Sequence, residues 1–121
     1  MSDALDAFSG RVRYWQGRFG LSEWELHVKE QVDDKPTEVT VDLAYLRAVI
    51  RMNPGIETED IDHTACHEVA HVFLGEFLEH SGNMREWFTG GHRNALDESW
   101  HLAWERTTER LARLMEAQET P

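Results

Sequence analysis

The chain has 121 residues, of which 40% are hydrophobic, and five Trp and five Phe give it enough bulk for a packed core of modest size. Its formal net charge is −11 at pH 7 and it has no cluster of Lys and Arg, so its overall field would repel nucleic acid. The amino terminus is acidic where a secretory signal is basic, no apolar run could span a bilayer, and the single cysteine cannot form an internal disulfide. We therefore expect one cytoplasmic domain over residues 1–121, with neither nucleic acid nor a membrane as a partner.

The first part of the chain changes from helical to strand periodicity. Apolar residues at three- and four-residue steps predict an amphipathic helix over residues 3–19. Three runs with strand character follow, from Trp24 to Val28, from Thr37 to Leu43 and from Ala48 to Met52. Because three strands follow one another in succession, we predict a three-stranded, mainly antiparallel sheet. Tyr45, in the link between the last two strands, is expected at the edge of the core.

The next predicted helix, over residues 58–79, carries the residues that point to chemistry. It contains His67-Glu68-Val69-Ala70-His71, an H-E-x-x-H motif. At about 100° per residue, the two histidines fall on one face of the helix and can bind the same ion. Glu68 lies beside them, where it can hold the water on that ion and take its proton as a general base.

Two neighbouring positions bear on this interpretation. Cys66 points toward the apolar face at helical spacing, so we expect a buried, inert thiol there. Gly75, one turn past His71, either leaves room for an ion or lies neutrally on the surface. The alternative to a metal site as a whole is an amphipathic helix whose two histidines are surface residues or satisfied core residues.

The last part of the chain combines an irregular stretch with a long helix. Residues 81–94 are irregular, and the adjacent Trp87 and Phe88 predict either a flap over a cleft or a loop packed on the core. Helical periodicity returns from Ala95 to Gln118, with an apolar stripe beside a stripe of acids and one histidine. The apolar stripe comprises Trp100, Trp104, Leu111 and Met115, and the second stripe comprises Glu98, His101, Glu105, Glu109 and Glu116.

A hydrolytic zinc site has three protein ligands and an open position for water, so His67 and His71 need a third ligand. A metzincin would place a histidine six residues after His71, where this chain has Phe77, so that class is excluded. A downstream histidine, as in an SprT-like arrangement, and a glutamate from the last helix both stay open. The candidates are His80, His92, Glu98, His101, Glu105 and Glu109.

The segment Glu105-Arg106-Thr107-Thr108-Glu109 resembles the E-x-x-x-D/E pattern of the gluzincins. In that pattern the first acid binds the metal and the second hydrogen-bonds a ligand histidine, so the resemblance implies Glu105 as the third ligand and Glu109 as its helper. Together with the Leu21–Leu26 strand entry, the H-E-x-x-H helix and the Glu109–Leu114 ending, the order of elements resembles the small zincin-like metallopeptidases of bacteriophages and prophages. Of these features, only H-E-x-x-H is chemically specific.

The residues and this resemblance together predict an α+β, zincin-like fold, in which a C-terminal helix crosses the motif helix. The predicted function is zinc-dependent hydrolysis of peptide bonds, in which His67, His71 and Glu105 bind Zn²⁺ and Glu68 activates the zinc-bound water. A protein or peptide substrate could add as a strand along the sheet edge, at Ala48–Met52. The alternative is a non-catalytic, zinc-stabilised binding domain, whose metal site would be closed by a fourth protein ligand such as His92 or His101.

Overall fold

The computed structural model of the chain describes residues 3–75 and 90–119. Three helices and three strands confirm the predicted α+β class. The elements are helix α1 (Asp3–Arg18), strands β1 (Glu25–Glu30), β2 (Glu38–Asp42) and β3 (Arg47–Met52), a 3₁₀ turn η1 (Thr58–Asp60), and helices α2 (Ile61–Phe73) and α4 (Gly90–Glu119). Within these residues, no helix is both long and apolar enough to cross a membrane.

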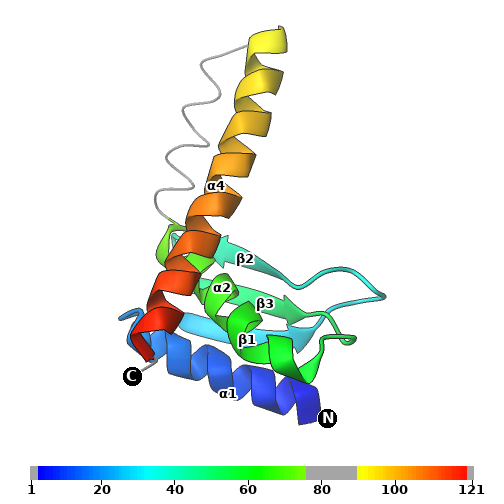
Figure 1. Ribbon diagram of the computed structural model, residues 1–121, viewed down its shortest axis with the longest axis vertical. Coiled ribbons are helices and arrows are strands. Elements are labelled where there is room, and N and C mark those ends of the chain that lie inside the picture. Colours follow the sequence, from blue (N-terminus) through cyan, green and yellow to red (C-terminus); the bar gives the residue numbers. More distant parts are fainter. Residues whose placement is uncertain (1–2, 76–89, 120–121) are drawn as a thin grey trace.

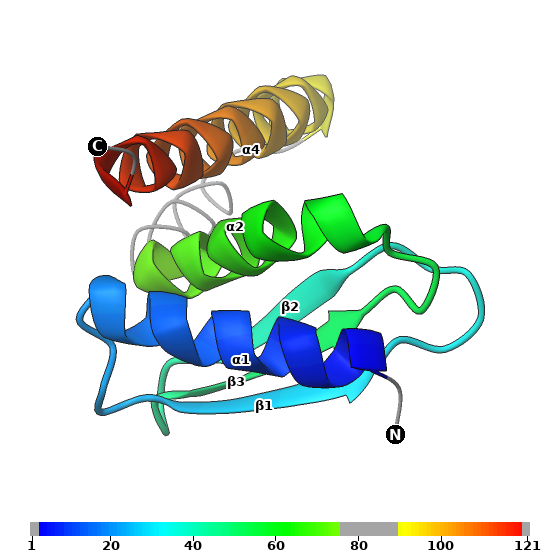
Figure 2. The ribbon, with the colours of Figure 1, turned by 60° about the horizontal axis from the view of Figure 1, so that its bottom comes forward.

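The elements form three layers (Figures 1 and 2). Helices α1 and α2 lie side by side on one face of the sheet, and α4 lies on the side of α2 that is turned away from the sheet. Helix α2 is therefore covered on two sides, which explains why its buried residues occupy more than one face of the helix. The motif helix is the central element of the domain.

The sheet is mixed, so the prediction of a mainly antiparallel sheet is wrong. Strand order is β1-β3-β2, with β2 antiparallel and β1 parallel to β3. Consecutive strands do alternate in direction, as expected, but β3 inserts between the first two and so becomes parallel to β1. As a result Ala48–Met52 lies in the central strand, and β2 is an edge strand of the sheet.

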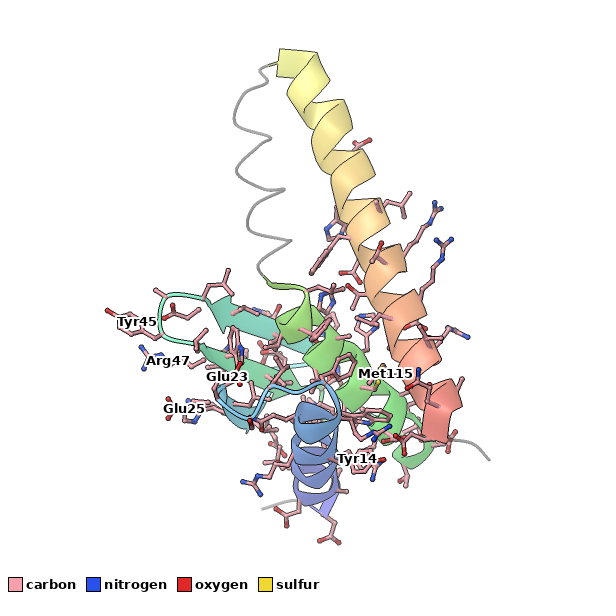
Figure 3. The ribbon with its side chains drawn as sticks, turned by 90° about the vertical axis from the view of Figure 1, so that its left-hand side faces the viewer. Tyr14, Glu23, Glu25, Tyr45, Arg47 and Met115 are labelled. Atoms are coloured by element: carbon pink, nitrogen blue, oxygen red, sulfur yellow. The ribbon has the colours of Figure 1, made fainter. Side chains whose placement is uncertain are left out.

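Only one face of the sheet carries the core. Along β3, Ala48, Ile50 and Met52 are at most 1% exposed and face the helices, whereas Val49 between them is half-buried on the other face. Residues of β1 and β2 follow the same alternation because they pair in register with β3. Tyr45 is 73% exposed at the β2–β3 turn and is not at the edge of the core, as we had expected; Figure 3 shows it and Arg47 at the outer end of the sheet.

Helix α1 anchors the two helices that carry the site. The Trp15 indole and the Arg11 guanidinium both donate to Asp62 Oδ1 in the first turn of α2, at 2.9 and 2.6 Å. At the other end of α1, Arg18 pairs with Glu119 at 2.6 Å, and the Tyr14 hydroxyl (Figure 3) also donates to Glu119. The first turn of α2 and the end of α4 are thus tied to the same helix.

The helix boundaries differ from the predicted ones. Helix α2 ends at Phe73, where the Leu74 N–H donates to Ala70, and α4 already begins at Gly90. Gly75 is buried, and a Cβ there would lie 3.3 Å from Val41 Cγ1, so its missing side chain lets the chain approach β2 closely. It neither makes room for an ion nor lies on the surface. Phe77, His80, Trp87 and Phe88 lie outside the described residues.

The alternation along β3 gives a direct test of which face holds the core. Replacing Ile50 by Ala should lower the free energy of unfolding by about 2–5 kcal/mol, because the side chain is fully buried and leaves a cavity. Its neighbour Val49, half-buried on the open face, is the matched control, and Val49→Ala should cost less than about 1 kcal/mol. Urea unfolding followed by circular dichroism measures both; equal losses would contradict the one-sided core.

Candidate metal centre

Three histidines on α2 face three glutamates on α4. The two helices run antiparallel along this contact, because the residue numbers of the contacting groups rise on α2 as they fall on α4. His63 contacts Glu116 and Glu109, His67 contacts Glu109 and Glu105, and His71 contacts Glu105. On α4 the acids directly follow the buried residues Trp104 and Thr108, which contact His71 of α2, and the partly buried Met115, which packs against the core.

His67, His71 and Glu105, which we call the inner site, come together as the sequence predicts. Each offers one ligand atom, and these atoms lie within 4.8 Å of one another. The carboxylate oxygens of Glu105 are 3.7 Å from His67 Nε2 and 3.5 Å from His71 Nε2. Zinc–ligand bonds of about 2.0–2.1 Å in a tetrahedron place the ligand atoms about 3.3 Å apart, so small side-chain movements would suffice. The donor set fits a divalent metal such as Zn²⁺.

Glu109 orients the first of these histidines. Its Oε1 lies 2.9 Å from His67 Nδ1, which is the contact that the gluzincin resemblance implies for this residue. When Nδ1–H donates to the carboxylate, the proton of the neutral ring is on Nδ1, and the lone pair of Nε2 points to the inner site. This arrangement selects the tautomer that binds a metal through Nε2.

His71 has its own partner, Thr108, which the sequence analysis did not single out. The Thr108 hydroxyl donates to the Trp104 carbonyl at 2.9 Å, so its lone pairs are left for His71 Nδ1, at a long 3.5 Å. Burial is the main reason why the pKa of His71 is lowered to about 4, and the neighbouring His67 and His101 contribute to this shift. The ring is therefore neutral at pH 7, as a metal ligand must be. The only sequence feature that pointed to Thr108 was its spacing, one helical turn after Trp104 of the apolar stripe.

Glu68 supports a cation at this site more directly. Its side chain is 5% exposed, and its Oε2 has no hydrogen-bond partner among the described residues. Burial is the main reason why the pKa of Glu68 is raised to about 8, and the charges of Glu105 and Glu38 contribute to this shift. Burying a carboxylate with one unpartnered oxygen is costly, and a divalent cation beside it would stabilise its charged form.

A cleft of about 510 Å³ opens at the inner site, between β2, α2 and α4. Its helical walls hold the inner-site residues together with Glu68, His101 and Trp104, and its other wall is formed by Thr37, Glu38, Val39 and Val41 of β2 and its approach. Glu68 and the three candidate ligands thus line a space that is large enough for part of a substrate.

The other candidate ligands are not brought together in the same way. His101 lines the cleft but does not belong to the described group of ligand atoms within 4.8 Å, and Glu98 is exposed on α4. The side chain of His92 and all of His80 lie outside the described residues. Cys66 is fully buried with its Sγ 3.6 Å from the Ala112 carbonyl, and burial raises the pKa of its thiol to about 12, so it is inert as the helical spacing predicts.

Comparison of the chain with protein-family models, with curated proteins and with solved structures gives no match. The resemblance to zincin-like peptidases therefore rests on the residues quoted for it.

The contact between Glu109 and His67 can be tested by metal binding. Glu109→Gln keeps the shape of the side chain but removes the charge that polarises His67, so zinc affinity should fall about 10–100-fold. Glu98→Gln, on the exposed part of the same helix, is the matched control and should leave zinc affinity unchanged. Competition titration with a zinc chelator measures both variants; equal affinities would remove Glu109 from the metal centre.

Proposed function

We propose that this protein is a zinc-dependent peptidase, with Glu68 as general base and His67, His71 and Glu105 as zinc ligands. The observation that carries the proposal is the position of Glu68, a buried carboxylate with an unpartnered oxygen that lines the same cleft as the three ligands. A purely structural metal site has no use for such a group, because burying a carboxylate oxygen without a hydrogen-bond partner among the described residues costs folding free energy.

Three protein ligands leave one position of a tetrahedral zinc ion open for water, as a hydrolytic site requires. When bound, zinc lowers the pKa of a coordinated water toward about 7 and polarises a carbonyl oxygen. Glu109 and Thr108 hold the two imidazoles with their Nε2 atoms toward the inner site, and Glu105 approaches both from α4. The Glu68 carboxylate accepts the proton of the attacking water and can pass it to the leaving amine.

The cleft also offers a place for an extended peptide. Because β3 is the central strand, the predicted edge at Ala48–Met52 is replaced by β2, which borders the cleft through Glu38, Val39 and Val41. The outer side of β2 pairs with no strand in the described part of the sheet, so its backbone groups can pair with a substrate strand. A peptide bound there would run past Glu68 and the inner site.

Replacing the proposed general base distinguishes a zinc peptidase from a non-catalytic, zinc-stabilised binding domain. Glu68→Gln should abolish peptide hydrolysis, with a loss of about 10²–10⁴-fold, while zinc remains bound. The free energy of unfolding should stay the same or rise, because the variant removes a buried carboxyl group whose ionisation is costly. Cleavage of a fluorogenic peptide library and zinc content are measured on the same preparations. A non-catalytic, zinc-stabilised binding domain would show no hydrolysis in the wild-type chain either.

The ligand assignment is tested by His67→Ala. Since His67 supplies one of only three protein ligands in the inner site, the purified variant should contain no zinc after dialysis. His27→Ala serves as the control, because His27 pairs with Glu25 on the open face of the sheet and faces away from the cleft. Zinc content is measured by atomic spectroscopy, and an unchanged content in His67→Ala would refute the assignment.

A further inference from the structure

A second set of ligand atoms lies one helical turn before the inner site. His63, His67 and Glu109, which we call the outer site, each offer one ligand atom, and these atoms lie within 4.8 Å of one another. We propose that the outer site is a second binding position for zinc, which excludes occupation of the inner site. This inference rests on the zinc assignment of the proposed function, but it does not depend on peptide hydrolysis.

The distances at the outer site suit a metal ion at least as well as those of the inner site. Glu109 Oε1 is 3.1 Å from His63 Nε2 and 2.9 Å from His67 Nδ1. These values lie close to the separation of about 3.3 Å between ligand atoms in a tetrahedral zinc site. The second oxygen of Glu109 is held by Arg113 at 2.9 Å, which leaves Oε1 directed to the two rings.

The outer site also has the supporting carboxylate that zinc-binding histidines require. His63 Nδ1 lies 2.7 Å from Glu116 Oε1, so the ring can donate its proton to Glu116 while Nε2 is free for a metal. Glu116 therefore does for His63 what Glu109 does for His67 in the inner site. The histidines on α2 and the glutamates on α4 thus offer two ligand sets of the same kind, one turn apart.

The two positions exclude each other because they share His67. The inner site uses Nε2 of this ring and the outer site uses Nδ1. A neutral imidazole carries one proton and has one lone pair free for a metal, so it can bind one ion at a time. Glu109 changes its role in the same way, from partner of His67 in the inner site to ligand in the outer site. We therefore expect one zinc ion per chain, with two possible positions.

The position of the ion decides whether Glu68 can act. Glu68 lines the cleft together with His67, His71 and Glu105, and neither His63 nor Glu109 is among the residues that line this cleft. An ion in the outer site consequently lies outside the cleft into which the substrate binds. The outer site would hold the metal in an inactive arrangement.

Removing the inner site alone tests the inference. In His71→Ala, zinc should still bind at one equivalent per chain, now through Nδ1 of His67, whereas the wild-type chain should bind one equivalent through Nε2. Two-bond ¹H–¹⁵N NMR spectra report which ring nitrogen carries the metal, and atomic spectroscopy gives the stoichiometry. Adding His63→Ala to His71→Ala should then abolish zinc binding.

Glu105→Ala provides a second route, because Glu105 is half-exposed and its loss removes the inner site without altering α2. It should show the same change to Nδ1, and His27→Ala should bind zinc as the wild type does. A folded His71→Ala without zinc, a double variant that retains zinc, or two equivalents in the wild type would each overturn the inference. A zinc-binding wild type that cleaves no peptide would overturn only the proposed function, and a wild type that binds no zinc would overturn both.

Discussion

The antiparallel contact between α2 and α4 is the constraint on which the candidate metal centre depends. It brings helices that are separated by 16 residues in the sequence close enough for imidazole and carboxylate groups to meet. Small buried residues make this approach possible, since Cys66 on α2 lies against the backbone of Ala112 on α4. The pairing of Glu119 with α1 holds the far end of α4 in place. A shift of α4 by one turn would exchange the acid that faces each histidine.

The same helix, α2, has to serve the core and the site. Its buried residues Ala65, Val69 and Val72 pack within the domain, yet Glu68 on the same helix is also buried and has no partner for one of its oxygens among the described residues. Such a group lowers the stability of the folded chain, and natural proteins retain that kind of cost mainly at functional sites. The combination of an apolar environment and adjacent metal ligands is what makes Glu68 a plausible base.

Strand order connects the fold with the proposed substrate site. Because β3 inserts between β1 and β2, the strand that borders the cleft is an edge strand, and within the described residues its outer side pairs with no other strand. Gly75 contributes to this arrangement, since a side chain there would press against Val41 of β2. The topology thus sets a pairing edge beside the inner site, although no single stretch of the sequence indicates this.

The sequence by itself determined the elements and the local spacing of the site. Periodicity located all three strands and both flanking helices, and H-E-x-x-H placed His67, His71 and Glu68 correctly on one helix, because their separation is fixed by the geometry of a single turn. The tertiary structure alone decided that Glu116 lies near His63, that β2 rather than β3 is the edge, and that His63 and Thr108 join the candidate metal centre. These features depend on the register of one element against another, and that register is set by core packing over the whole domain, which no local pattern encodes.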